Sequence, residues 1–527
     1  MSAIKRLICI AILLGTFSLL AAAGITAKSA TFDEVQHFGM GRYLLLNQKW
    51  DVMGSIIHPP LGYYILSLPL LLYDDDKQAW EYEEKNRDTV FLGGVDITRG
   101  QSLLSKPENR DDRQLIACRL VVLFLAVVLG VYVYLFSSEL FGVTGGLFSL
   151  FLYAFTPVIL AFSGISTQDM PLTVFSFISV YYLWRYLQDS RVKHSVLSGL
   201  FLGMALAVKF TAMLLIPYEV FIYGLYLYKT KNKPSYTVLL IAGIALLVLF
   251  GSYGFKITPF LQGNEYRLAE MKRGQAAFLN GRHSNFGWWY FYLESLLIKT
   301  PIPLLLLFAT SLFYLNKIKK NALTILILFT PVISLTVLFS LSPFSVGIRY
   351  LLPMFPFALV GMGVLYRQAS RQMVIFTCCM ALWLVFGTVH IAPHFLAYFN
   401  EVTGGADNGY RYLVDSNLDW GQDLKGLKKY MDENGIRKVS LSYFGADSPQ
   451  RYGIDYDWLP SHYLYNPTPD KPYDISPDQL IAVSATNLQG VYFENRDEFA
   501  WLRKYRPLAK IGYSIFIYDP QEIIRNR

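Results

Sequence analysis

Eleven apolar stretches of 14 to 23 residues constrain this chain more than any other feature of its sequence. About 20 apolar residues in a helix cross the roughly 30 Å hydrocarbon core of a bilayer. Charged residues make up only 16% of the chain, whereas a soluble domain carries about 25%. We therefore expect a polytopic α-helical membrane protein of about 11 transmembrane helices, and we exclude a soluble or disordered chain. The expected spans are Leu7–Ala23, Gln114–Phe136, Gly145–Phe162, Met170–Tyr186, Ser195–Val208, Ala212–Tyr228, Tyr236–Phe255, Pro301–Leu315, Ala322–Leu341, Arg349–Tyr366 and Met373–Val389.

The distribution of lysine and arginine predicts the orientation of these spans. Loops on the cytoplasmic side carry an excess of basic residues. With a cytoplasmic N-terminus, 13 basic residues lie inside, and Lys209 is the one basic residue in the short outer turns. The 13 are Lys5, Arg6, Arg185, Arg191, Lys193, Lys229, Lys231, Lys233, Lys317, Lys319, Lys320, Arg367 and Arg371. Residues 1–30 also fit a cleaved signal peptide, and in that case too the following residues emerge outside.

Three longer pieces fall on the outer side of the predicted membrane domain, residues 1–394. Two are loops, at residues 24–113 and 256–300, and the third is the tail at 395–527. The tail has the pattern of a small extracytoplasmic α/β domain. Its expected helices are Leu424–Asn434 and Phe499–Tyr505, and its expected strands are Lys438–Tyr443, Gln479–Ala485 and Ile511–Tyr518.

Two adjacent carboxyl groups, Asp33 and Glu34, directly follow the first span, and His37 comes three residues later. Partial desolvation at the membrane edge raises the basicity of a carboxylate, which suits a general base. The alternative is that both acids only start an interfacial helix, since acids favour the first turn. His58 precedes Pro59-Pro60 and an apolar segment, Leu61–Tyr73, that is too short to span and is expected to lie in the interface.

A third acid, Asp169, lies in the short turn before the fourth span, and Pro171 follows it in the first turn of the expected helix. Capping of this helix would also explain Asp169. The predicted topology, however, places the acids and histidines on the same face as Lys209, Lys299 and Arg349. Acids beside cations at one interface suit a reaction that needs a base and a bound phosphate.

The motifs around these residues resemble those of the GT-C membrane glycosyltransferases. The resemblance rests on Asp33-Glu34, His58-Pro59-Pro60-Leu61-Gly62, Asp169-x-Pro171, Gly203–Thr211, Gly287–Tyr290, Lys299–Pro301 and Gly347–Pro353. The nearest relatives are the protein O-mannosyltransferases and the bacterial glycosyltransferase family 39 enzymes, which include the aminoarabinose transferases of lipid A. The resemblance covers essentially the whole chain.

This resemblance implies an enzyme that moves a sugar from a polyprenyl-phosphate donor to an extracytoplasmic hydroxyl group, with inversion. Asp33 would be the catalytic base, and Glu34 and Asp169 would position the acceptor or stabilise charge. The residues that would bind the donor sugar or neutralise its phosphate are His37, Arg42, His58, Lys209, Lys299 and Arg349. The partners would be the lipid-linked sugar, membrane lipids and a lipid, glycan or protein acceptor, and no nucleic acid. No cofactor is certain, although some members of the superfamily use a divalent metal.

Three departures from the mannosyltransferases point to a bacterial enzyme of the inner (plasma) membrane. The chain reads Asp33-Glu34-Val35-Gln36-His37-Phe38-Gly39, one residue out of step with the Asp-Glu-Val-His-Phe-Gly of the mannosyltransferases. Tyr63 stands where they have a lysine after His-Pro-Pro-Leu-Gly. Residues 256–300 replace the large outer domain of the eukaryotic enzymes.

The main alternative is a multi-span transporter of a lipid-linked or small polar substrate. A transporter needs ionisable residues inside its spans and repeated, broken helices. We identify only Arg119 as a charge in the spans, near one end, and no internal repeat. His390 and His394 lie four apart without a third metal ligand nearby. Asp415, Asp419 and Asp423 recur every four residues, which we interpret as a solvated helix face rather than a calcium loop.

Overall fold

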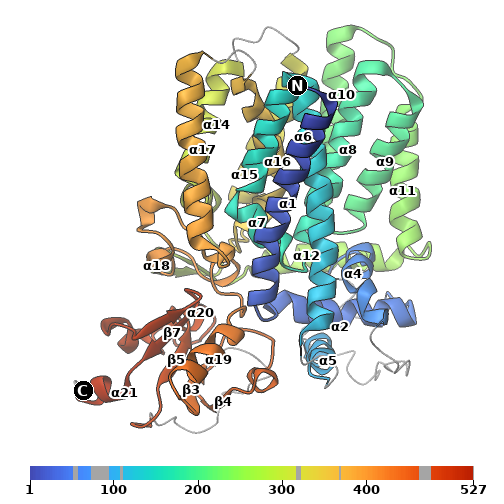
Figure 1. Cartoon of the computed structure of the whole chain (residues 1–527). Coiled ribbons are helices and arrows are strands. Elements are labelled where there is room, and N and C mark those ends of the chain that lie inside the picture. The colour runs from blue at the N-terminus through green and yellow to red at the C-terminus, as the bar shows by residue number, and fades with distance from the viewer. Residues whose placement is uncertain are drawn as a thin grey trace.

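The structure is a computed structural model, and it describes residues 1–50, 57–72, 94–106, 111–315, 322–366, 370–461 and 476–525. A helical bundle carries a small mixed sheet at one end, and short helices lie across the same end (Figure 1). The bundle helices are α1 (Ala3–Ala27), α6 (Arg113–Ala154), α7 (Pro157–Ser163), α8 (Asp169–Asp189), α9 (Val192–Leu206), α10 (Leu215–Thr230), α11 (Val238–Ser252), α13 (Phe291–Lys299), α14 (Ile302–Leu315), α15 (Ala322–Ser340), α16 (Phe355–Met362) and α17 (Arg371–Ile391).

Helix lies in each of the eleven predicted stretches, but fewer of them qualify as spans. In the described part of the chain, six helical segments are long and apolar enough to cross a membrane, or seven if α13 and α14, bent by 109°, form one span. The six are Ala3–Ala27, Arg113–Ala154, Phe210–Thr230, Ala322–Ser340, Ile348–Tyr366 and Arg371–Ile391. The predicted count of eleven is therefore too high by this measure, and the described residues form a polytopic helical membrane protein with six to seven apolar spans.

The difference in count has physical causes that can be named. The second predicted stretch and much of the third lie in the 42-residue α6, which is kinked at Gly142 (φ 85°). α9 and α11 have 15 residues each, or about 22 Å of helix at 1.5 Å per residue, which is less than the hydrocarbon thickness. α8 has 21 residues, but it includes Asp169, Arg185 and Asp189, so it is less apolar than the six segments.

Five short helical elements cross the end of the bundle that carries the sheet (Figure 1). They are α2 (Phe32–Asn47), α4 (Pro60–Ser67), the 3-10 helix η1 (Leu68–Leu72), α5 (Gly94–Leu104) and α12 (Thr258–Arg273). The predicted interfacial segment is thus α4 with η1, and its last residue, Tyr73, lies outside the described residues. Gly41 and Gly100 have no room for a Cβ atom, because α2 packs against Ser67 and against α5 at these points.

The first turn of α2 forms where the sequence predicts it. Thr31 and Glu34 make a capping box, and Asp33 and Glu34 occupy the first turn, where negative charge is favourable beside the helix N-terminus. Asp169 lies in the first turn of α8 rather than at its N-cap, which is Gln168.

The C-terminal part forms a five-stranded sheet in the order β4-β3-β5-β7-β6. β3 (Lys438–Ser442) is parallel to β4 (Asp455–Trp458) and to β5 (Ile481–Ser484), while β7 (Ile515–Tyr518) is antiparallel to β5 and to β6 (Ala509–Ile511). The amphipathic α19 (Leu424–Glu433) buries Leu424, Leu427 and Met431. The predicted helix at 499–505 is a 3-10 turn, Ala500–Lys504, and β4 and most of β6 were not predicted.

One prediction for this domain is wrong. Asp415, Asp419 and Asp423 do not share a solvated helix face, since they precede α19 in a turn and loops, and Asp419 and Asp423 are buried. Asp423 instead accepts a hydrogen bond from Ser514 (2.7 Å) and pairs with Lys28 (2.5 Å) at the end of α1. The Asp423 carboxyl group is therefore a structural part of the joint between the sheet domain and the bundle.

Candidate functional site

Four charged side chains from distant parts of the sequence meet where α2, α8 and the sheet domain come together. Arg349, at the start of the 3-10 helix η5 (Ile348–Met354), pairs with Asp33 Oδ2 at 2.6 Å and lies 3.8 Å from Asp169 Oδ2. Lys209 Nζ donates to Asp169 Oδ1 at 2.7 Å. Two acids and two cations thus form one connected cluster, as the sequence predicts for residues on a common face.

Aromatic rings and a hydroxyl group fix the two cations and Asp169. The Arg349 guanidinium lies 4.3 Å from the centre of the Trp420 ring, and Lys209 Nζ lies 4.6 Å from that of Tyr350. Such cation–π contacts are attractive and use up no hydrogen-bond donors. Thr167 Oγ1 donates to Asp169 Oδ2 at 3.2 Å. The cluster is therefore preorganised, and most donors of Arg349 and Lys209 remain available for a ligand.

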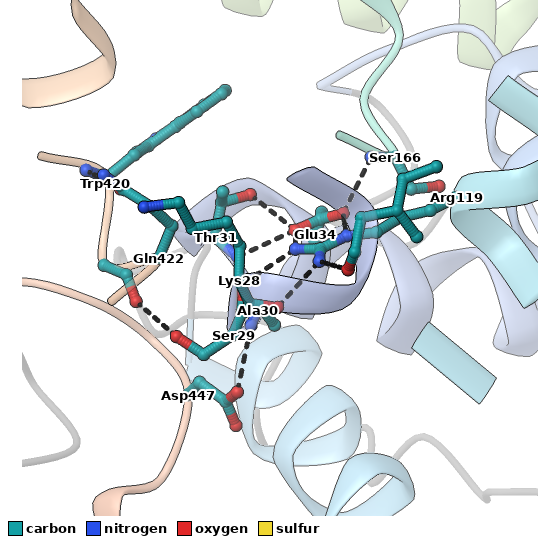
Figure 2. A network of polar contacts seen from close by, with 12 residues as sticks. Lys28, Ser29, Ala30, Thr31, Glu34, Arg119, Ser166, Trp420, Gln422 and Asp447 are labelled. Carbon is teal, nitrogen blue, oxygen red and sulfur yellow. Dashed lines mark hydrogen bonds and ion pairs between the residues drawn. The ribbon is translucent and has the colours of Figure 1, made fainter. Parts of the chain in front are cut away.

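Glu34 belongs to a different network, which is closed (Figure 2). Its carboxylate receives two hydrogen bonds from Arg119, at 2.8 and 2.7 Å, and further bonds from the backbone N–H groups of Thr31 and Ser166. The side chains of Glu34 and Arg119 are both essentially unexposed. Burial alone would raise the pKa of Glu34, but the charge and hydrogen bonds of Arg119 lower it below its ordinary value. This geometry ties α2 to α6 and favours a structural role for Glu34.

Arg119 also binds the short segment that joins α1 to α2. Its guanidinium donates to the carbonyl oxygens of Ile25, Lys28 and Ser29 at 2.7 to 2.9 Å. The next residues along this segment pair with the sheet domain, since Phe32 N donates to Trp420 O at 2.9 Å. Asp33 is thus held between the bundle and the sheet domain.

The predicted histidines lie near the cluster. His37 Nδ1 is 3.5 Å from Ser166 O, and its ring meets the rings of His58 and Tyr63 edge-on, with 6.0 and 5.5 Å between ring centres. His58 lies 3.2 Å from a guanidinium nitrogen of Arg267 on α12. Burial lowers the pKa of both histidines, with nearby cations adding to the effect at His58. Both rings are therefore expected to be neutral near pH 7.

The two remaining predicted cations, Arg42 and Lys299, are both buried. Lys299 Nζ donates to the carbonyl oxygens of Leu396 and Asn417, at 2.7 and 2.6 Å, and lies 4.2 Å from the Phe399 ring. These contacts bind α13 to the start of the tail. Arg42 is 1% exposed on α2. The structure brings Lys209 and Arg349 to the acids, and it does not bring Lys299 there.

Two cavities adjoin the cluster. An apolar cavity of about 390 Å³ lies among α8, α10, α15 and η5, and Tyr350 is part of its wall. A second cavity of about 170 Å³ lies between α2 and the sheet domain. Its wall is Phe32, Asp33, Gln275, Arg349, Asp415, Trp420, Phe444 and Tyr492. Arg349 and its neighbour Tyr350 therefore separate a hydrophobic chamber from a polar and aromatic one.

The described residues contain no group of three or more His, Cys, Asp or Glu side chains that could hold a metal ion. His394, the second member of the histidine pair, instead lies 2.5 Å from Lys28 Nζ. Burial, with the Lys28 charge adding to it, lowers the pKa of His394 to about 4. His394 therefore belongs to the joint between the bundle and the sheet domain.

Sequence reasoning missed several residues of the site. Arg267, Asp415, Trp420 and Tyr492 lie in the long outer pieces, where no local pattern shows that they approach Asp33.

Sequence reasoning also overlooked Glu219, so the expectation that Arg119 is the only charged residue within the spans is wrong. Glu219 lies inside α10, is buried, and accepts a hydrogen bond from Ser179 at 2.7 Å.

Two comparisons with known proteins gave matches, one to a sequence family and one to solved structures. Residues 111–253 match the family model described as dolichyl-phosphate-mannose-protein mannosyltransferase, and no curated protein matches the sequence. The fold is similar to that of ArnT from Cupriavidus metallidurans in the apo state, with a TM-score of 0.52, 11% identity and 99% of each chain covered. For the same protein bound to undecaprenyl phosphate, the TM-score is 0.50 and the identity is 11%, with 98% of each chain covered.

A weaker similarity, to the protein O-mannosyltransferase Pmt1–Pmt2 complex of S. cerevisiae, has a TM-score of 0.33 at 16% identity. It covers 51% of this chain and 34% of that one. The ArnT-like fold and the family match together confirm the resemblance inferred from the motifs. The chain is therefore a polytopic membrane protein with a fold similar to that of ArnT, and its residues 111–253 match the mannosyltransferase family model.

Proposed function

We propose that this enzyme transfers a sugar from a polyprenyl-phosphate donor to an acceptor hydroxyl group, with inversion and with Asp33 as general base. The observation that carries the proposal is the Asp33–Arg349–Asp169–Lys209 cluster between an apolar and a polar cavity. A donor of this kind has an isoprenoid chain, a phosphate and a sugar, which match an apolar chamber, two cations and a polar chamber in that order. The similar ArnT fold has been observed with undecaprenyl phosphate bound.

The part of the isoprenoid chain next to the phosphate would occupy the 390 Å³ cavity, whose wall is mostly aliphatic and aromatic. Burial of its CH₂ and CH₃ groups contributes about 25 cal/mol per Å² of apolar surface. The phosphate would then lie beside Tyr350, within reach of Lys209 and Arg349. Arginine binds phosphate with paired N–H donors and lysine acts as a point charge.

Binding of the phosphate would also prepare the base. In the structure Arg349 neutralises Asp33 at 2.6 Å, and a phosphate that competes for this guanidinium would weaken the pairing. Asp33 could then accept the proton of the acceptor hydroxyl. The hydroxyl oxygen forms the new bond to the anomeric carbon as the bond from that carbon to the phosphate oxygen breaks.

The electron pair of the broken bond goes to the leaving polyprenyl phosphate, whose growing charge Arg349 and Lys209 would stabilise. The attacking oxygen and the leaving phosphate lie on opposite sides of the anomeric carbon, so the configuration inverts. Asp169 would orient both cations, and His37 and His58, with Arg267, would line the donor side. Glu34 is assigned here to positioning α2 rather than to touching substrate.

We further propose that this site faces the extracytoplasmic side of a bacterial inner membrane, with the N-terminus in the cytoplasm. The support is the distribution of basic residues together with the common position of α2, α12 and the sheet domain at one end of the bundle (Figure 1). Lys317, Lys319, Lys320 and Arg367, which contribute to that distribution, lie outside the described residues.

The test is sugar transfer by the full-length protein in membrane vesicles from a panel of radiolabelled undecaprenyl-phosphate sugars. Asp33→Asn should lower the rate by at least about 100-fold, the lower end of what a general base contributes. Asp455→Asn, on the exposed edge strand β4, is the matched control and should keep the wild-type rate. Equal rates for wild type and Asp33→Asn would overturn the assignment of the base, and no transfer from any donor by the folded wild type would overturn the proposed function.

A further inference from the structure

We propose that a polar cavity at the end of the bundle opposite the sheet domain binds the phosphate group of an anionic phospholipid. The cavity has about 300 Å³ and lies among the ends of α8 and α10 and the loop 231–237 between α10 and α11. α8 begins at Asp169 in the charged cluster and rises about 30 Å over its 21 residues, so this cavity lies far from the cluster (Figure 1). It shares no lining residue with either cavity beside the cluster. It is therefore a separate site, and the inference does not depend on the proposed transfer reaction.

Two tyrosine hydroxyl groups in the wall of this cavity have a hydrogen-bond donor to spare. The Tyr223 hydroxyl accepts a hydrogen bond from the backbone N–H of Ser235 at 3.0 Å, and the Tyr226 hydroxyl accepts one from the side-chain amide of Asn232 at 3.1 Å. Neither hydroxyl donates to an acceptor within the described parts of the chain. A tyrosine hydroxyl can donate one hydrogen bond in addition to those it accepts. Both O–H groups are therefore available to a ligand that only accepts, such as a phosphate.

Further hydrogen bonds hold the loop 231–237 against the ends of the two helices. The Tyr186 hydroxyl, near the end of α8, lies 2.5 Å from Thr237 Oγ1, and Ser235 Oγ lies 2.7 Å from the same atom. On α10, the rings of Tyr223 and Tyr226 stack with 6.2 Å between ring centres and 22° between planes. The wall of the cavity is thus formed before a ligand arrives, which lowers the entropy that binding would cost.

The charge around this cavity is positive. Residues Lys229–Lys233 include three exposed lysines, of which Lys233 lies in the cavity wall. None of the three pairs with an acid in the ranges that the structure describes. The acid nearest to the wall in sequence, Asp189, is already 2.8 Å from His194 Nδ1 and 3.4 Å from the Arg191 guanidinium. No acidic residue is among the described residues that line the cavity. Donors and positive charge without a competing carboxylate suit an anion.

The side chains next to the cavity indicate that this anion belongs to a lipid. Tyr228 and Tyr236, on either side of the loop, are 82% and 83% exposed, and Leu239 on α11 is 68% exposed. In a polytopic membrane protein, tyrosines at helix ends lie at the level of the lipid head groups, and anionic lipids attract basic segments at this level. A phospholipid would place its phosphate in the cavity and its acyl chains along α10 and α11. The orientation proposed above assigns this lipid to the cytoplasmic leaflet.

The test is lipid binding by the full-length protein in a neutral detergent, measured by native mass spectrometry. Dioleoyl phosphatidylglycerol, which is anionic, is compared with dioleoyl phosphatidylcholine, which has the same acyl chains and no net charge. Wild type should bind phosphatidylglycerol at least about fivefold more tightly. Lys233→Gln should weaken that binding about fivefold, and Tyr226→Phe, which removes one O–H donor, about two- to tenfold. Lys193→Gln, on α9 at the same end of the bundle but outside the cavity, loses the same charge and should keep the wild-type affinity.

Melting temperatures give a second readout, because a ligand that binds only the folded protein raises the melting temperature. Phosphatidylglycerol should raise it in wild type, and Lys233→Gln should lose most of that rise. Equal affinity for the two lipids would overturn the inference. Equal losses of affinity in Lys233→Gln and Lys193→Gln would also overturn it, because the charge would then act without a defined site. Glycerol 3-phosphate and inorganic phosphate are tested in parallel. If either binds as tightly as the lipid and displaces it, the ligand is a soluble phosphate and the assignment to a lipid is wrong.

Discussion

Two networks of carboxylate and arginine begin at adjacent residues of α2, and they differ in almost every respect. Glu34 is unexposed, and its two oxygens accept five hydrogen bonds from Arg119, Thr31 and Ser166. The Asp33 side chain is 21% exposed, pairs with Arg349 alone in the described part of the chain, and borders a cavity. The Glu34 network is closed, because it has no hydrogen-bonding capacity left for a ligand. The Asp33 network is open, because it is held in place and still has such capacity.

The contrast shows that charge and chain position do not determine function here. Both acids lie in the first turn of one helix and both face an arginine. What separates them is the number of hydrogen bonds already made and the access to empty space. A carboxylate whose lone pairs are filled by protein donors is a structural element, and one with free capacity beside a cavity can act on a substrate. The largest expected effects follow from breaking each network separately.

The closed network should matter most for stability. Arg119→Met leaves the buried Glu34 carboxylate without its charge partner, which typically costs about 3–5 kcal/mol of unfolding free energy. We expect a large fall in the melting temperature of the purified protein, measured by intrinsic fluorescence in detergent. Adding Glu34→Gln to this variant should restore part of the loss, because the unpaired charge is then gone. A double variant no more stable than Arg119→Met would contradict the structural role of this pair.

The open network should matter most for turnover. Arg349→Met removes the cation nearest to Asp33 and to the proposed phosphate site, and the rate of sugar transfer should fall about 100- to 1,000-fold. The melting temperature should change far less than in Arg119→Met, because Asp33 is partly exposed. Arg349→Lys keeps the charge but loses the paired donors and should retain an intermediate rate. A rate unchanged in Arg349→Met would remove this residue from the site.

The composition of this site was largely predictable from sequence, but its division into two networks was not. Outer ends of spans share one membrane face, so Asp33, Asp169, Lys209 and Arg349 could be expected together from topology and motif. Successive residues of a helix point about 100° apart, so Asp33 and Glu34 had to face different ways. Which of them faces inward depends on the position of Arg119 in α6, 85 residues farther along the chain, and no local pattern contains that information.

The same limit explains the fold predictions that failed. Hydropathy locates apolar helices well, and helix lies in every predicted stretch. It does not reveal that α9 and α11 stop at 15 residues or that α6 continues to a kink at Gly142. Lys299 likewise has the chemistry of a phosphate ligand, yet its three-dimensional neighbours are two backbone carbonyl oxygens. The spacing of Asp415, Asp419 and Asp423 matches a helix that does not form, because the chain folds into the domain joint instead.

A third carboxyl group, Asp419, sharpens the comparison because it is buried without an arginine partner. Its Oδ2 accepts one hydrogen bond from the N–H group of Thr486 at 2.8 Å, and Oδ1 has no partner among the described residues. Burial raises the pKa of Asp419 to about 8. The folded protein therefore holds this proton where the unfolded chain releases it, so the contribution to stability is present below about pH 4 and is lost as the pH rises towards 8.

Asp419→Asn cannot ionise and should escape this loss. Relative to wild type it should gain about 1–3 kcal/mol of unfolding free energy between about pH 5 and pH 8. Melting temperatures of both proteins across this range measure the difference. Asp455→Asn, at an exposed position, should follow the wild-type curve. Parallel curves for Asp419→Asn and wild type would mean that the pKa of Asp419 is the same in the folded and unfolded protein.

The smallest expected effect on the rate of sugar transfer comes from the hydrogen bond that orients Asp169 in the open network. Thr167 Oγ1 donates to Asp169 Oδ2 at 3.2 Å, opposite the oxygen that accepts from Lys209. Thr167→Ala removes one buried hydrogen bond, typically about 0.5–1.5 kcal/mol, so kcat/KM for sugar transfer should fall about two- to tenfold. Thr167→Ser keeps the hydroxyl group and should keep the wild-type rate. If Thr167→Ser loses as much activity as Thr167→Ala, the methyl group rather than the hydrogen bond orients Asp169. The two networks would then differ in how they are packed as well as in how they are bonded.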